Sequence, residues 1–168
     1  MPPLAMFTPI EACGCCESRR AVKVLFLDID GVLNHTASTM VLEPHLVARL
    51  LELLERDASI RICVSSARRH DPELPGQLDE AGLDVKGKVI GCTRKGKLVD
   101  EQQAAAARVE EIEAWLQEAP AEGYDVLAWA AVDDMKLLFP EPSVFIYVDP
   151  DEGLSETDVA AVASALSC

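Results

Sequence analysis

The chain has 168 residues and is 49% hydrophobic, which is the size and composition of one globular domain and excludes wholesale disorder. No apolar run approaches the roughly 20 residues that cross a bilayer, and no secretory signal opens the chain, so we expect a cytoplasmic protein without membrane contact. The net charge of −14, from 29 acidic and 15 basic residues, disfavours a broad nucleic-acid-binding surface but leaves room for a local basic pocket.

Residues 1–20 are predicted to form an irregular leader that is rich in Pro, Gly and Cys and ends in two arginines. Its cysteines, Cys13, Cys15 and Cys16, have no second cluster at a spacing that zinc sites use, so no metal role is predicted for them. The remaining residues, 21–168, are predicted to form one domain without repeats or internal linkers.

Patterns typical of strands and helices alternate after the leader. The expected elements, in chain order, are a strand over 22–27, a helix from Pro44 to about Arg56, a strand over 60–64, a short helix from Pro72 to about Ala81, a weaker strand over 88–92, a helix from about Glu101 to Glu118, strands over 125–132 and 144–148, and a terminal helix. Ser155 and Asp158 form a capping box that marks the start of the terminal helix. The order predicts an α/β fold, a three-layer sandwich around a mostly parallel, five-stranded, Rossmann-like sheet. Such sheets bind ligands beyond the carboxyl ends of their strands.

Two carboxylates, Asp28 and Asp30, stand at the end of the first strand and are followed by Gly31. In an extended backbone, residues two apart point the same way, so both side chains reach one crevice. Glycine allows a sharp turn at that point. Two solvated acids in a loop are the ordinary alternative. The apolar strand before them, where unpaired carboxylates are costly, and the Gly-Val-Leu-Asn that follows favour a functional pair.

The segment from Val24 to Asn34 (VLFLDIDGVLN) resembles the first motif of the haloacid dehalogenase-like (HAD) superfamily. The resemblance implies that Asp28 attacks phosphorus and forms an aspartyl-phosphate, while Asp30 protonates the leaving oxygen and then activates the hydrolytic water. An acid at the second position, instead of the Thr of the ion pumps, favours a phosphatase. Asn34, which closes the motif, is an expected substrate-binding residue.

The second strand is followed by a polar stretch that fits the second HAD motif. The superfamily binds a phosphate oxygen there with a hydroxyl, for which Ser65 is the first choice and Ser66 the second. Two serines after a strand are otherwise ordinary turn chemistry. Arg68 and Arg69 are expected either to face substrate phosphate or to be solvated at the surface, and Arg68 is the one expected to bind substrate.

The fourth strand ends in the acidic pair Asp133 and Asp134. By the same resemblance, this pair completes a Mg²⁺ site with Asp28 and with Asp30, the latter through its backbone carbonyl. Oxygen ligands are what Mg²⁺ prefers, and the cation would offset repulsion among crowded carboxylates. An ordinary acidic turn is the alternative.

The third HAD motif supplies a Lys or Arg near the start of the helix before the fourth strand. The stretch Arg108–Leu116 resembles that of the HAD domains associated with RNA-repair proteins, which favours Arg108. Because the predicted helix would place Arg108 well inside it, Lys95 and Lys97 in the preceding loop stay open as alternatives. An exposed Arg108 that pairs with Glu111 is the interpretation without a function.

The resemblance covers residues 22–167, with Ala67 standing where that subfamily often carries Trp. The intervals between the motifs leave no room for a large cap domain, so we expect an open site. The expected partner is a phosphorylated substrate, either a small molecule or a macromolecular end. The subfamily favours a nucleic-acid end, whereas the net charge argues against one. We also expect a monomer.

Other functions have less support from the sequence. A HAD-fold interaction module with weak or lost turnover is the main alternative, because Ala67 departs from the subfamily pattern. A response-regulator receiver domain also phosphorylates an Asp, but it places its acidic pair at the first strand and its acceptor on a later one. A dinucleotide-binding domain would carry G-x-G-x-x-G after the first strand, and this sequence does not.

Overall fold

The computed structural model describes residues 18–35, 41–94, 100 and 103–167, so the leader cysteines, Lys95 and Lys97 lie outside the described residues. The strands are β1 (Arg20–Leu27), β2 (Ile60–Val64), β3 (Val89–Cys92), β4 (Tyr124–Asp133) and β5 (Phe145–Tyr147). The helices are α1 (Pro44–Arg56), α2 (Leu74–Glu80), α3 (Val85–Lys88), α4 (Ala104–Glu118) and α5 (Glu156–Ala165), with a 3-10 turn, η2, at Pro142–Val144.

The strands form one sheet in the order β3-β2-β1-β4-β5, and each pairing in it is parallel. β1 lies at the centre, paired with β2 on one side and β4 on the other. Its last four residues are buried whichever face they point to, as expected for a strand that helices cover on both sides. The predicted α/β architecture is confirmed, and the end of β1 reaches the middle of the carboxyl edge.

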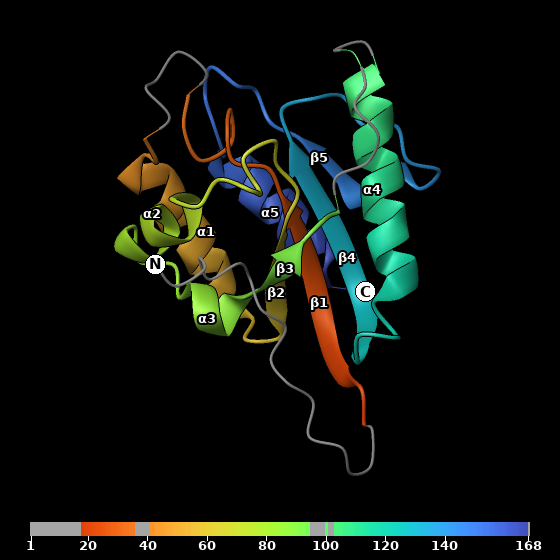
Figure 1. Ribbon diagram of the computed structural model, residues 1–168. Coiled ribbons are helices and arrows are strands. Elements are labelled where there is room, and N and C mark those ends of the chain that lie inside the picture. The colour runs from red at the N-terminus through yellow and green to blue at the C-terminus, as the bar shows by residue number, and fades with distance from the viewer. Residues whose placement is uncertain (1–17, 36–40, 95–99, 101–102, 168) are drawn as a thin grey trace.

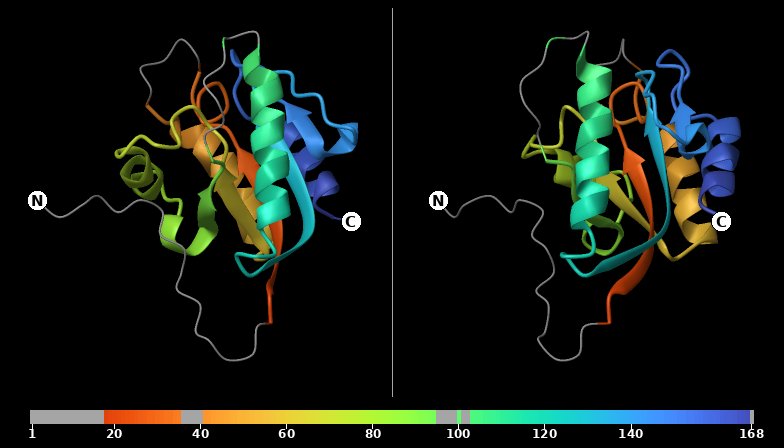
Figure 2. Two further views of the ribbon diagram at one scale, coloured as in Figure 1. Left: turned by 45° about the vertical axis from the view of Figure 1, so that its right-hand side comes forward. Right: turned by 90° about the vertical axis from the view of Figure 1, so that its right-hand side faces the viewer.

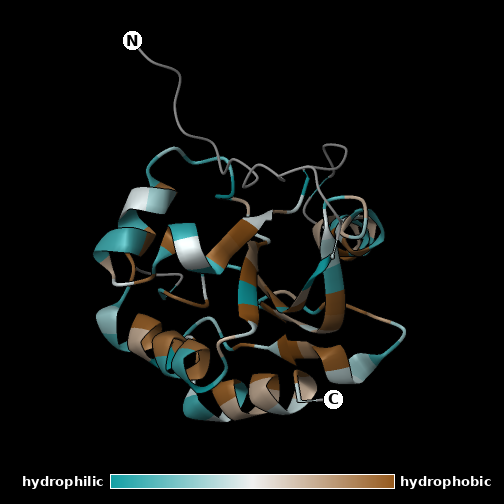
Figure 3. Cartoon of the chain, turned by 90° about the horizontal axis from the view of Figure 1, so that it is seen from below, coloured by the Kyte–Doolittle hydropathy of each residue, from teal (hydrophilic) through white to brown (hydrophobic). Residues whose placement is uncertain are grey.

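Helices cover both faces of this sheet, which gives three layers. α1 and α5 pack on one face and α4 on the other, as Figures 1 and 2 show. One apolar cluster lies between the sheet and the α1–α5 layer, and a second lies beneath α4 around Phe26 and Trp115. Apolar residues accordingly dominate the strands in Figure 3, whereas the helices carry both polar and apolar residues.

The ends of some strands differ from the prediction. β1 begins at Arg20, so the last residue of the predicted leader belongs to the sheet, where it pairs with Tyr124. β5 is shorter than predicted, because Val144 ends η2 and only three residues pair with β4. The differences at Arg20 and Val144 lie at the amino ends of their strands, away from the carboxyl edge.

The segment between β2 and β3 holds two helices where one was predicted. α2 begins at Leu74 and not at Pro72, because the Asp71 carboxylate accepts a hydrogen bond (2.9 Å) from the backbone amide two residues on and holds a turn there. α3 was not predicted. It begins after Asp84, whose side chain accepts a hydrogen bond (3.0 Å) from the amide of Gly87.

The start of α5 was predicted correctly. The Ser155 hydroxyl accepts a hydrogen bond from the Asp158 amide (3.2 Å), and the Asp158 carboxylate accepts one from the Ser155 amide (2.8 Å). Both backbone donors are satisfied by this capping box.

The described residues hold no large cap domain over the carboxyl edge, as predicted. Among the described residues, α1 is the only helix or strand that the chain forms between β1 and β2, and α2, α3, β3 and α4 are those it forms between β2 and β4. None of the helices in the described part of the chain combines the length and the apolar character that crossing a membrane requires.

Candidate active site

Three carboxylates meet at the carboxyl ends of β1 and β4. Asp28 directly follows β1, Asp133 is the last residue of β4, and Asp134 comes next. One oxygen from each lies within 4.8 Å of the others. Asp28 and Asp133 are only 5% and 1% exposed, and Asp134 is half-buried. The parallel pairing of β1 with β4 brings these distant parts of the chain to one point.

Arg108 lies against this carboxylate cluster and is itself buried. Its Nη1 atom is 2.7 Å from an oxygen of Asp133 and 3.7 Å from one of Asp28, and it also donates to the backbone carbonyl of Ser65. α4 begins at Ala104, so Arg108 lies in its second turn and not in mid-helix as predicted. The alternative in which Arg108 is exposed at the surface and pairs with Glu111 is therefore wrong.

The electrostatics of the cluster are dominated by burial. Burial raises the pKa of Asp28 to about 6, although the Arg108 guanidinium opposes the rise. Burial and the neighbouring Asp28 charge raise the pKa of Asp133 to about 8, and burial also raises the pKa of Asp134. Three ionised carboxylates and one guanidinium would leave two negative charges in a desolvated space, where a divalent cation is the matching counter-ion.

Asp30 lies beside this cluster without being part of it. Its side chain is 40% exposed, and one of its oxygens accepts a hydrogen bond (2.9 Å) from the Asn34 amide group. The side-chain carbonyl oxygen of Asn34 accepts a hydrogen bond from the Gly31 backbone amide (2.9 Å), and this bond closes the turn after β1. The side chain of Asp30 thus stands outside the group of predicted metal ligands, and the role of its backbone carbonyl stays a prediction.

Arg68 and Arg69 are both buried, so the alternative that they are solvated at the surface is wrong. The Arg68 guanidinium lies 3.5 Å from Asp30 and is anchored by Asp71 (3.1 Å) and Gln77 (2.7 Å). Arg68 and Asn34, both predicted to bind substrate, therefore share a contact with the same Asp30 oxygen. This geometry suits residues that orient the Asp30 carboxylate.

Hydroxyl groups line the neighbouring part of the edge. The Ser65 hydroxyl is buried and has no hydrogen-bond partner among the described residues. A buried hydroxyl of this kind is suited to donate a hydrogen bond to an oxygen of a ligand. Ser66 accepts a hydrogen bond from the Arg68 amide (3.2 Å), and its hydroxyl lowers the pKa of Asp28. Thr93, which was not predicted as a site residue, is a second buried hydroxyl without a hydrogen-bond partner in the described part of the chain. It directly follows β3, as Ser65 directly follows β2.

Gly31 is required by the position of Asp134. Gly31 has a φ of +78°, in the left-handed region that favours glycine. A Cβ atom there would also collide with the Asp134 carboxylate. The glycine of the first motif therefore leaves space for Asp134, the acid that follows β4.

A second ion pair that sequence reasoning missed holds the Ser65–Ser66 segment. The buried Arg69 guanidinium pairs with Glu111 (2.9 Å), one turn after Arg108 on α4, and donates to the Ser66 carbonyl (2.7 Å). No local pattern signals this pair, because its members are 42 residues apart in the chain.

An all-parallel α/β sheet with an Asp-x-Asp-Gly turn after its central strand, a hydroxyl after the next strand and an acidic pair after the fourth defines the HAD hydrolase fold. The family model of the HAD domain in Swiss Army Knife RNA repair proteins matches residues 24–159. The chain therefore belongs to this family. No curated protein and no solved structure matches it.

Proposed function

We propose that this protein is a Mg²⁺-dependent phosphatase that works through a phosphorylated Asp28. The observation that carries the proposal is the convergence of Asp28, Asp133 and Asp134 within 4.8 Å, at an edge over which the described part of the chain forms no large cap. Asp30 lies two residues after Asp28, where an acid and base is needed.

The residues present fit Mg²⁺. All three carboxylates of the cluster offer oxygen, which this ion prefers, and their combined charge with Arg108 matches a divalent cation. Asp28, Asp133 and Asp134 would hold it. When bound, Mg²⁺ neutralises charge on the phosphoryl group and on the carboxylates around it.

In the first step, the Asp28 carboxylate attacks phosphorus. An Asp28–phosphorus bond forms while the bond from phosphorus to the leaving oxygen breaks, and Asp30 gives its proton to that oxygen. One Asp28 oxygen accepts a hydrogen bond from the Ile29 amide (2.8 Å), which fixes the carboxylate for attack. The Ser65 hydroxyl, which has no hydrogen-bond partner in the described part of the chain, is available to a phosphate oxygen.

In the second step, Asp30 takes a proton from a water molecule, and that water attacks the phosphorus of the acyl-phosphate. The Asp28–phosphorus bond breaks, inorganic phosphate leaves, and both carboxylates return to their first state. Asn34 and Arg68 hold the Asp30 carboxylate through both steps, and its 40% exposure gives it access to water.

The substrate class we propose is a phosphate at the end of a large molecule, such as a nucleic-acid strand. Two observations support this class. The described residues place no large cap over the edge, so a polymer end has access. The family model is that of HAD domains in RNA repair proteins. Our expectation of a cytoplasmic monomer is unchanged.

The experiment is a phosphate-release assay with Mg²⁺ or with a chelator, on an aryl phosphate and on oligonucleotides phosphorylated at the 3′ or 5′ end. We expect release only with Mg²⁺, and none from Asp28→Asn. Asp30→Asn should lower turnover by a factor of about 10² to 10⁴. It should still form the phosphorylated protein from the aryl phosphate, whose leaving group needs little help from an acid.

The matched control is Asp125→Asn, which removes the same charge from the exposed opposite end of β4. It should leave phosphate release unchanged. A folded wild-type protein that is inactive on the whole panel would overturn the proposal and favour an interaction module.

A further inference from the structure

A pocket of about 360 Å³ lies at the amino ends of the strands. Its lining includes Arg20 at the start of β1, Arg61 near the start of β2, Ile90 of β3 and Tyr124 at the start of β4. The catalytic carboxylates lie at the other ends of these strands. Since β1 has eight residues, the two sites are roughly 23 Å apart.

The charge of the pocket is opposite to that of the protein. Three basic residues, Arg20, Arg61 and Lys86, line it, and none of its lining residues is acidic. The chain as a whole has 29 acidic residues against 15 basic ones, so this composition is unusual for it. Within the described part of the chain, none of these three cations forms an ion pair with a carboxylate. An anionic ligand would therefore meet cations that are not already neutralised.

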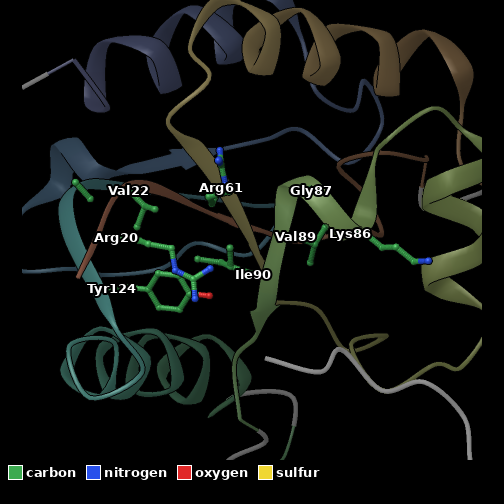
Figure 4. A pocket seen from close by; sticks show the side chains of 9 residues that line it. Arg20, Val22, Arg61, Lys86, Gly87, Val89, Ile90 and Tyr124 are labelled. Atoms are coloured by element: carbon green, nitrogen blue, oxygen red, sulfur yellow. The ribbon is translucent and has the colours of Figure 1, made fainter. Parts of the chain in front are cut away.

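The two arginines contact an aromatic ring and backbone carbonyls, and no carboxylate among the described residues pairs with either. The Arg20 guanidinium lies 5.2 Å from the centre of the Tyr124 ring, and Figure 4 shows it against that ring. Arg61 donates from Nη1 to the carbonyls of Ala58 (2.6 Å) and Ile60 (2.9 Å), which leaves its Nη2 and Nε without an acceptor among the described residues. In Figure 4 the side chains of Lys86 and Arg61 both point away from the Arg20–Tyr124 pair, so that pair is the centre of the pocket and the other two cations add positive charge to its lining.

Apolar and aromatic surface adjoins these cations. Val22, Ile90 and the Tyr124 ring line the same pocket, and the other neighbour of that ring is Trp115, stacked at 6.2 Å. The volume is at the lower end of that of ligand pockets and far exceeds what a phosphate ion needs. A ligand that fills it thus carries an anion for the arginines and a flat or apolar body beside them.

We propose that this pocket binds a nucleoside phosphate, either free or within a strand. Arginine pairs with phosphate through two parallel hydrogen bonds and stacks on flat rings, so Arg20 beside Tyr124 suits both parts of such a ligand, and Arg61 adds positive charge to the lining. The site is separate from the catalytic carboxylates and does not depend on the proposed phosphatase activity.

The experiment is a titration of the full-length protein, without Mg²⁺, followed by backbone amide chemical shifts. The probes are AMP, inorganic phosphate, adenosine, and a short oligoadenylate with hydroxyl groups at both ends. AMP should shift the amides around Arg20, Arg61 and Ile90 and leave those around Asp28 and Asp133 unmoved. Inorganic phosphate and adenosine should each bind at least tenfold more weakly than AMP. Tighter binding of AMP than of the oligonucleotide would point to a free nucleotide, and the reverse to a strand.

Arg20→Gln should weaken AMP binding by about tenfold, since it removes a charge-assisted contact to phosphate. Arg61→Gln should weaken it to a smaller degree, because it removes positive charge from the lining of the pocket. Arg56→Gln is the matched control, because it removes the same charge from an exposed residue at the end of α1 that does not line the pocket. It should change the affinity less than twofold. The proposal is overturned if AMP moves no amides near the pocket, if adenosine binds as tightly, or if all three variants weaken binding equally. If a variant fails to fold, the positions of the amide chemical-shift changes in the wild-type protein still show whether AMP binds at this pocket.

Discussion

The buried pair of Arg69 and Glu111 gives a prediction that needs no knowledge of the substrate. Their side chains are 6% and 10% exposed and their charged atoms are 2.9 Å apart. Glu111→Ala would leave the Arg69 guanidinium buried with the Ser66 carbonyl as its one remaining acceptor in the described part of the chain. A buried charge that loses its counter-ion is strongly destabilising.

The expected loss is about 3 kcal/mol of the free energy of unfolding, the lower end of the range for a broken buried pair. For a domain of this size it lowers the melting temperature by about 6 to 12 °C. Arg69→Met should cost a similar amount. The double variant should cost clearly less than the sum, since it leaves no unpaired guanidinium.

The assay is urea unfolding of the four proteins in this double-mutant cycle. Glu118→Ala is the matched control, because it makes the same substitution on the same helix. Glu118 pairs with Arg94 at the surface, where the two side chains are 42% and 75% exposed. Such a pair should be worth less than about 0.5 kcal/mol. Equal losses from Glu111→Ala and Glu118→Ala, or strict additivity in the cycle, would refute the reasoning.

Three further predictions concern the rest of the described chain. Gly31→Ala should abolish phosphate release and lower stability by about 2 kcal/mol, because the backbone is left-handed there and the new methyl group collides with Asp134. Ser155→Ala should cost about 1 kcal/mol in urea unfolding, since it removes the N-cap of α5. Hydrogen bonds, first from Ser59, lower the pKa of Asp57 to about 2, below its unfolded value near 3.8, so this group stabilises above pH 4. Its contribution, about 1 kcal/mol after solvent screening, is lost as the pH falls from 4 to 2.

The outcomes that contradict these predictions are distinct. Full activity of Gly31→Ala would show that Asp134 is not held over this turn. An unchanged unfolding midpoint for Ser155→Ala would mean that the capping box adds nothing to α5. Asp57→Asn should be less stable than the wild type at pH 6 and equal to it near pH 2, so a constant difference across this range would show that the charge of Asp57 is irrelevant.

Local patterns were sufficient for much of the fold and for the acids of the site. β1 and β2 are apolar runs, and the helix at Pro44 has a leucine stripe, so their type follows from periodicity. The positions of Asp28, Asp133 and Asp134 follow from one rule, that the carboxyl ends of parallel strands lie at the same edge of the sheet. Their proximity could therefore be expected before any coordinates.

Other features depend on contacts between distant segments. Whether Arg108 is exposed or buried depends on how α4 lies across the sheet, since its sequence permits a surface pair with Glu111 equally well. α3 has only four residues and an Asp cap, so its periodicity is too short to detect.

The sequence by itself determined the order of the strands and of the helices other than α3, the apolar centre, and the acids at the ends of β1 and β4. These depend on neighbours in the chain, where spacing and residue type act directly. Only the tertiary structure decided that Arg108 lies against Asp28 and Asp133, that Arg68 contacts Asp30, and that basic residues gather at the amino ends of the strands. Those arrangements arise from packing between segments far apart in the chain, which local patterns do not encode.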